Sequence, residues 1–266
     1  MRVVLIQAEV DHRPPFAERV AAMGEAVVSH AARHRADLVL LPELWATGFF
    51  NFDDYARTAE PLTGPAVRAL GAAARAASVH LHAGSLVERG EDGRLHNTSL
   101  LFGPDGGLLH SYRKVHLFGH RSRESTLLSA GTTVRCADSA LGRLGLSACY
   151  DLRFPELYRA LIDDGARVLL VTAAWPAGRI AHWRLLVQAR AVENQAWVVA
   201  CNAAGAHAGV RAGGGSLVVD PWGRVVAEAG PEAAVLVADV DPALADRTRA
   251  EFPALADRRI PVRPPD

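Results

Sequence analysis

Short apolar segments alternate with longer alanine-rich segments along the chain. Residues 3–6 and 38–41 have the length and composition of buried strands, and a helical repeat of apolar residues spans about 16–35 between them. The same alternation continues farther along. It predicts helices at 66–77, 155–163 and 180–194, and strands at 79–86, 168–172, 197–201 and 235–240.

Three pairs of strand-like segments are predicted to form hairpins. The turn sequences GPDG and DPWG separate 98–102 from 108–112 and 216–219 from 224–227, and segments 133–137 and 144–148 pair around Gly142. Strand–helix units mixed with hairpins indicate mixed sheets with helices outside them. About a dozen strands are too many for one strongly twisted sheet, so the pattern favours an α/β fold with two stacked sheets.

Composition narrows the class of protein. The chain has 266 residues with 29 basic and 29 acidic side chains, and a net charge of zero argues against nucleic acid or an anionic membrane as a partner. No apolar run reaches 18 residues, and the start of the chain does not look like a signal peptide. Three cysteines without a CxxC spacing form neither a disulfide framework nor a zinc cluster. We therefore expect a soluble, cytoplasmic globular protein.

Cys149 is the first candidate for a catalytic residue. It lies in LGLSACYDLRFPELYR, between a predicted strand and a predicted helix. Such a corner exposes a side chain, and the helix N-terminus nearby favours a thiolate. The alternative is a buried structural cysteine, which is the ordinary fate of a free cysteine and the interpretation we keep for Cys136 and Cys201.

A nucleophilic cysteine needs a base, and Glu43 and Lys114 are candidates to assist it. Glu43 in VLLPELWATGFF follows an apolar strand that Pro42 ends, although a solvated loop glutamate has the same pattern. Lys114 in HSYRKVHLFGH is the single lysine among 29 basic residues. An enclosed ammonium there would stabilise an oxyanion and a thiolate, whereas the alternative is a surface lysine.

The stretches LPELWATGF, YRKVHLF and CYDLRFPELYR, in this order, resemble the nitrilase or carbon–nitrogen hydrolase superfamily. The segments HNTSLLFGPDG, AAWP and RAVENQAWVVACN extend the resemblance over most of the chain. It implies a four-layer α-β-β-α sandwich, with 1–252 as the hydrolase domain and the proline-rich 253–266 as an extended tail. It also implies a homodimer or a larger homo-oligomer.

The resemblance implies a Glu-Lys-Cys triad of Glu43, Lys114 and Cys149, and RESTLLSAG places a second glutamate at Glu124. Glu43 would take the thiol proton, and Cys149 would attack an amide carbonyl. The oxyanion would lie between the Lys114 ammonium and the backbone N–H of Tyr150, and Glu124 would orient Lys114 or the substrate. No cofactor is required.

The substrate pocket is predicted from the residues that flank these motifs. Trp175 in AAWP follows a strand and either walls the site or anchors a sheet edge. Tyr150 is a second pocket residue. Arg153 is expected to form a structural salt bridge rather than to bind substrate.

Within the family, the motifs are most similar to the omega-amidase branch, whose members hydrolyse small 2-oxo acid monoamides. A small amide is therefore the expected substrate, with a nitrile or an N-carbamoyl amine as alternatives. A non-catalytic binding protein on the same scaffold is the alternative from another class. A zinc hydrolase using His80 and His82 lacks an evident third ligand, and no GxSxG or GxGxxG motif supports a serine hydrolase or a dehydrogenase.

Overall fold

The computed structural model describes residues 1–9, 11 and 13–261. Two six-stranded mixed sheets form its centre, with strand orders β14-β1-β2-β3-β4-β5 and β13-β12-β9-β8-β7-β6. The strands of the first sheet are β1 (Arg2–Gln7), β2 (Leu38–Leu40), β3 (His80–Arg89), β4 (Leu95–Phe102), β5 (Leu108–Arg113) and β14 (Ala234–Asp239). Those of the second are β6 (Cys136–Ser139), β7 (Gly142–Ala148), β8 (Val168–Ala173), β9 (Trp197–Asn202), β12 (Leu217–Val219) and β13 (Val225–Glu228).

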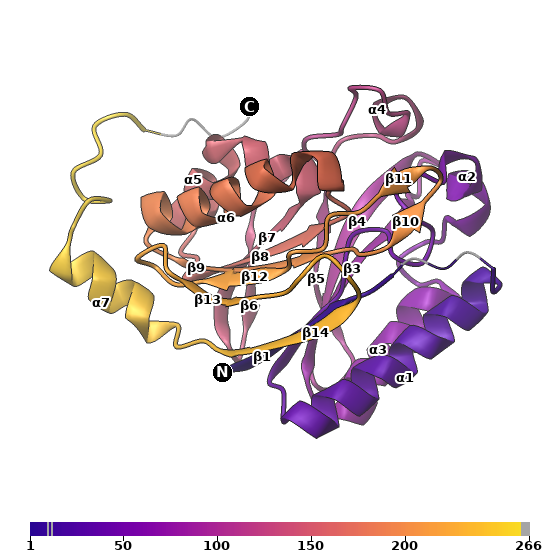
Figure 1. Cartoon of the computed structure of the whole chain (residues 1–266), viewed down its shortest axis with the longest axis horizontal. Helices are drawn as coiled ribbons and strands as arrows, with labels where there is room; N and C mark the ends of the chain where they lie inside the picture. Colours follow the sequence, from indigo (N-terminus) through magenta and orange to yellow (C-terminus); the bar gives the residue numbers. More distant parts are fainter. Residues whose placement is uncertain (10, 12, 262–266) are drawn as a thin grey trace.

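Helices cover the outer faces of both sheets (Figure 1). Helices α1 (Phe16–His34) and α3 (Pro65–Ala77) lie on the first sheet, and α5 (Pro155–Asp163) and α6 (Ile180–Asn194) lie on the second. The predicted four-layer α-β-β-α sandwich is therefore confirmed.

Side-chain alternation along the strands explains the layers. In β1, Val3 and Leu5 belong to the hydrophobic cluster that includes the second sheet, α5 and α6, whereas Val4 and Ile6 pack with Val20 and Val27 of α1. Alternate side chains of this strand therefore pack into two different hydrophobic cores, as expected when both faces of a sheet are covered.

The short elements were not predicted. They are the strands β10 (Ala206–His207) and β11 (Val210–Arg211), the helices α2 (Tyr55–Thr58), α4 (Glu124–Leu127) and α7 (Ala243–Glu251), and the 3-10 turns η1 (Phe52–Asp54), η2 (Cys149–Arg153) and η3 (Ala177–Arg179). In α7 only Ala245 and Thr248 are buried, so its sequence carries no apolar stripe to signal a helix.

Beyond α7, residues 253–261 form no helix or strand, and the remainder of the predicted tail, 262–266, lies outside the described residues. Within the described part of the chain, none of the helices is both long enough and apolar enough to cross a bilayer.

The two sheets meet where several strands end. Strands β7, β8 and β9 are parallel, so their carboxyl ends lie at one edge. The N–H of Glu43, beyond the end of β2, donates to the carbonyl of Ala173 at the end of β8, over 3.3 Å. This contact joins the two sheets at the place where the candidate residues gather.

Candidate active site

Four ionisable side chains from separate segments meet at this edge. Glu43 follows β2, Lys114 follows β5, Glu124 begins α4, and Cys149 begins η2 directly after β7. Cys149 is 7% exposed and the other three are fully buried. The structure therefore brings all four predicted residues together.

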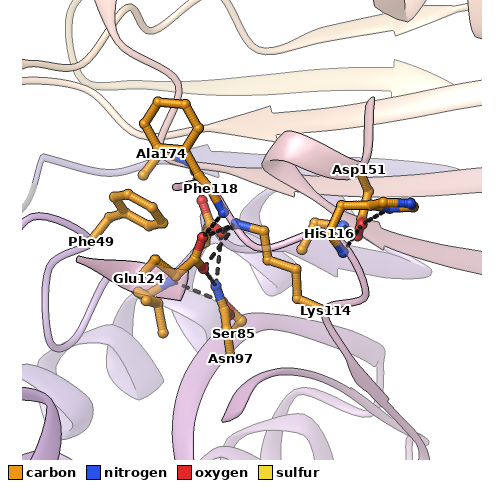
Figure 2. Close-up of polar contacts among 12 residues, drawn as sticks. Phe49, Ser85, Asn97, Lys114, His116, Phe118, Glu124, Asp151 and Ala174 are labelled. Atoms are coloured by element: carbon orange, nitrogen blue, oxygen red, sulfur yellow. Dashed lines mark hydrogen bonds and ion pairs between the residues drawn. The ribbon is translucent and has the colours of Figure 1, made fainter. Parts of the chain in front are cut away.

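The Lys114 ammonium lies between the two glutamates, and Figure 2 shows it next to Glu124. Its Nζ atom is 2.8 Å from Oε1 of Glu43 and 2.9 Å and 3.0 Å from the two carboxylate oxygens of Glu124. The ring of Phe49 covers the same nitrogen, with its centroid 5.1 Å away. Lys114 is thus an enclosed cation and not a surface lysine.

Backbone geometry fixes Glu43. The residue that follows it, Leu44, has a left-handed φ of 44°, and its N–H donates to Ser85 Oγ over 3.0 Å. The second carboxylate oxygen of Glu43 accepts the N–H of Ala174 over 3.0 Å. Both carboxylate oxygens of Glu43 therefore accept hydrogen bonds from neighbouring donors.

Cys149 sits at a strained corner. Its φ is 47°, a left-handed conformation that is rare for a side-chain-bearing residue and is often found at functional sites. Its thiol interacts with the Glu43 carboxylate and with the backbone amide of Ala174. Burial, and next the Glu43 carboxylate, raise the pKa of the thiol well above its usual value, while Lys114 opposes the shift. The thiol is therefore protonated at neutral pH and lies beside an acceptor for its proton.

The charges of Lys114 and Glu124 respond to each other. Burial acts to lower the pKa of the Lys114 ammonium, but Glu124 and Glu43 outweigh it and raise that pKa, so the ammonium stays charged. Burial raises the pKa of Glu124, against the effect of Lys114, and Glu43 adds to the rise. One cation therefore serves two carboxylates in a space without bulk water.

Cys149 lines a pocket with about 310 Å³ of empty space, which includes space open to solvent. The pocket is lined mainly by aromatic side chains, with two arginines. The lining residues are Phe49, Phe50, Phe118, Cys149, Tyr150, Arg153, Ala174, Trp175, Pro176 and Arg179. Both predicted pocket residues, Tyr150 and Trp175, belong to this set.

The salt bridge expected for Arg153 is not formed. Across residues 1–9, 11 and 13–261, no carboxylate forms an ion pair with it. Its guanidinium instead lies over the Trp175 ring, 4.7 Å from the centroid, and the side chain lines the pocket. The expectation was wrong because the guanidinium stacks on the Trp175 ring and its Nη2 faces Nδ1 of His182, 3.5 Å away, instead of a carboxylate.

Three other residues at the site were missed. Arg179 lines the pocket over Phe118, Asn97 contacts both glutamates, and Asp151 accepts hydrogen bonds beneath Cys149. Asn97 and Asp151 lie within the segments HNTSLLFGPDG and CYDLRFPELYR, so polar residues at buried positions of these segments were the available signal. Arg179 lies in a turn with no distinguishing pattern.

Known proteins are similar to this chain in sequence and in architecture. Residues 2–250 match the sequence model of the family described as Carbon-nitrogen hydrolase. A 2-oxoglutaramate amidase of Paenarthrobacter nicotinovorans is 37% identical over 98% of this chain and 90% of its own.

Two solved structures extend the likeness to three dimensions. Saccharomyces cerevisiae Nit3, a member of branch 10 of the nitrilase superfamily, has a TM-score of 0.89 at 30% identity, over 98% of this chain and 97% of its own. A mutant amidase from Nesterenkonia sp. AN1, with the acetamide moiety of fluoroacetamide on its active-site cysteine, has a TM-score of 0.84 at 30% identity, over 97% and 94%. The chain therefore belongs to the carbon–nitrogen hydrolase family.

Proposed function

We propose that the protein hydrolyses a small carboxylic amide to an acid and ammonia through a thioester on Cys149, with a 2-oxo acid monoamide such as 2-oxoglutaramate as the first candidate substrate. One observation carries the proposal: the Cys149 thiol, the Glu43 carboxylate and the Lys114 ammonium converge, and the cysteine lines a pocket with aromatic walls and two arginines. The family and the amidases among its relatives support amide hydrolysis.

The geometry fits a two-step reaction. Glu43 takes the proton of the Cys149 thiol while the sulfur attacks the amide carbonyl carbon. The Lys114 ammonium and the backbone N–H of Tyr150 hold the oxyanion, each contributing about 3–4 kcal/mol if well placed. The carbon–nitrogen bond breaks, and Glu43 returns the proton to the leaving nitrogen.

Ammonia then departs and a thioester remains. Glu43 takes a proton from a water molecule as the water attacks the thioester carbon. The carbon–sulfur bond breaks, Glu43 returns the proton to the sulfur of Cys149, and the acid is released. Glu124 keeps the Lys114 ammonium in place throughout. These steps use only side chains and backbone groups of this chain and need no metal or organic cofactor.

The two arginines in the pocket favour an amide that carries a carboxylate. Arg179 lies with its guanidinium 5.4 Å from the centroid of the Phe118 ring, and Arg153 lies over Trp175. In the described residues neither forms an ion pair with a carboxylate, so each has donors available for an anionic group. The far end of an acid monoamide supplies such a group. The similarity to a 2-oxoglutaramate amidase supports the same substrate.

The test is ammonia release from 2-oxoglutaramate, propionamide, an N-carbamoyl amine and the corresponding nitriles, with mass spectrometry of the intact chain to detect the acyl-enzyme. We expect turnover of the amides, and a mass increase equal to the acyl group on a peptide that contains Cys149. Turnover of nitriles alone would contradict the amidase proposal, and no turnover of any of these would favour a non-catalytic binding protein. Cys149→Ala is the control, which should remove turnover and acylation together.

We also propose that the protein acts in the cytoplasm as a homodimer, with residues 1–252 as the hydrolase domain. All three cysteines are buried free thiols, which suits a reducing compartment. Leu185 and Val192 on α6 are 66% and 52% exposed, and such an apolar helix face suits a subunit contact.

A further inference from the structure

Asn97 on β4 donates to both glutamates of the site. Its side chain is 1% exposed, and Nδ2 lies 2.8 Å from Oε1 of Glu43 and 2.9 Å from Oε1 of Glu124. The Lys114 Nζ atom contacts the same two oxygens over 2.8 Å and 2.9 Å (Figure 2). Two nitrogen donors, one charged and one neutral, therefore bridge one pair of carboxylates.

Electrostatics explains why a neutral donor suits this position. Two buried carboxylates with one ammonium already leave an excess negative charge, so an aspartate there would add a third acid. A second cation would hold both glutamates more strongly and would reduce the tendency of Glu43 to accept a proton. A primary amide has two N–H groups, so it can donate to both oxygens without changing the charge.

The surroundings of the amide fix its orientation. Its Oδ1 atom is buried without a hydrogen-bond partner among the described residues, which costs folding free energy. A rotated amide would place this oxygen against two carboxylates, so the unpaired oxygen is the better arrangement. Within the described part of the chain, the hydrogen bonds of this side-chain amide therefore all go to the two glutamates.

The backbone of Asn97 acts on the third member of the group. Its carbonyl accepts the N–H of Lys114 over 2.8 Å, so one residue of β4 fixes the lysine through its backbone and the glutamates through its side chain. A displaced Asn97 would therefore move Lys114, Glu43 and Glu124 together.

We propose that Asn97 is a positioning residue, which holds Glu43 and Glu124 in one arrangement beside Lys114 so that Glu43 faces the Cys149 thiol. This inference rests on the proposed function, in which Glu43 is the base. Asn97 itself is not a catalytic residue, because among the described residues it neither lines the pocket nor contacts the sulfur of Cys149.

The test compares Asn97→Leu and Asn97→Asp, which are close to asparagine in size, with the wild type. Both remove the shared donor, and the aspartate also adds a charge. We expect kcat to fall about 100-fold in the leucine variant and further in the aspartate variant, with KM within about threefold, because the substrate does not touch this residue.

The pH profile separates positioning from simple damage to the fold. A donor stabilises the charged form of a carboxylate, so its loss raises the pKa of Glu124 further. In Asn97→Leu the acid limb of kcat/KM should therefore move to higher pH by about half a unit or more. We expect the same shift in the pH dependence of the rate at which iodoacetamide alkylates Cys149. This measurement requires no amide turnover.

Asn194→Leu is the matched control. Asn194 is a fully buried asparagine on α6, whose Nδ2 donates to the Arg190 carbonyl over 2.9 Å. Its loss should lower the melting temperature and leave the acid limb in place. If Asn97→Leu does not fold, the acid limb of Asn97→Asp is compared with that of the control instead. Asn97→Ser is used if neither of these variants folds.

A wild-type acid limb and wild-type kcat in a folded Asn97 variant would overturn the positioning role. Failure of the proposed function is distinguishable, because it would appear as a wild-type enzyme that releases no ammonia from any amide. The alkylation profile still reports on Asn97 in that case.

Discussion

At the scale of single residues, the chemistry depends on the protonation of Cys149 and on a small number of buried charges. A thiol with a raised pKa is unreactive until a base removes its proton. The proposed base, Glu43, is held by Lys114, Asn97 and the amide of Ala174. In the proposed reaction this proton moves to Glu43 as the sulfur attacks the amide carbonyl carbon.

Lys114→Met tests the charge balance. The substitution leaves two buried carboxylates without their cation, and breaking a buried ion pair in this way costs about 3–5 kcal/mol of folding free energy. The carboxylates become neutral as the pH falls, so the loss should be smaller at pH 5 than at pH 8. Denaturant unfolding at both pH values measures it, and an equal loss at the two would contradict the proposed charges.

Arg179→Ala tests the recognition of the substrate. A charge-assisted hydrogen bond contributes about 1.5–3 kcal/mol, so KM for an anionic amide should rise at least tenfold. For a neutral amide such as propionamide we expect a change below threefold. Arg184→Ala on α6 is the control, since that arginine is paired with Glu228 at 2.9 Å. Equal effects on anionic and neutral amides would show that Arg179 does not bind a carboxylate.

At the scale of elements, Asp151 connects two segments that carry catalytic candidates. One carboxylate oxygen accepts the N–H of Ala148, next to Cys149, over 2.9 Å, and also the hydroxyl of Tyr112 over 2.7 Å. The other accepts the backbone N–H and the ring Nδ1 of His116, over 2.9 Å and 2.8 Å. The turn that holds Cys149 and the loop that holds Lys114 are thus bound to one buried carboxylate.

Asp151→Asn should loosen this connection. The amide replaces one acceptor with a donor that faces other donors, which costs about 1–3 kcal/mol of stability and lowers kcat more than tenfold. Asp164→Asn is the control, because that carboxylate accepts the N–H of Cys136 over 2.7 Å, away from the site. The measurements are thermal unfolding and steady-state kinetics. A kcat equal to that of the control variant would refute the connection.

The same elements show how far the sequence could predict this fold and this site. Apolar periodicity located α5 and α6 and most of the strands, because burial determines where their apolar residues lie. Glu43, Lys114 and Cys149 were found because each follows a strand in a distinctive segment.

Other features left no such pattern. Asn97 and Asp151 are polar residues in buried positions, and their roles depend on contacts with residues 54 and 35 positions away. The left-handed φ angles of Leu44 and Cys149 arise from tertiary structure, since neither residue favours that conformation. Short elements such as β10 and β11 are too brief to show a period.

At the scale of the whole molecule, α6 links the pocket to a surface suited to a second subunit. The helix begins directly after Arg179, whose carbonyl accepts the Trp175 indole N–H over 2.8 Å. Farther along, Gln188 donates to the Gly223 carbonyl over 3.0 Å, so α6 adjoins the turn between β12 and β13. Leu185, Val192 and the 39% exposed Trp222 together give this face its apolar character.

The proposed homodimer should therefore depend on α6. Leu185 and Val192 are seven residues apart and lie on one side of the helix, so replacing both with glutamate places four charges across a twofold contact. We expect the wild type to run as a dimer and the double variant as a monomer in size-exclusion chromatography with light scattering.

Leu109→Glu is the control, since Leu109 is 42% exposed on β5, at the far edge of the first sheet. A double variant that remains dimeric would place the subunit contact elsewhere. A monomeric wild type would contradict the proposed homodimer. Because α6 also supports Arg179 and Trp175, the monomer should have a raised KM for an anionic amide while Cys149 remains open to alkylation.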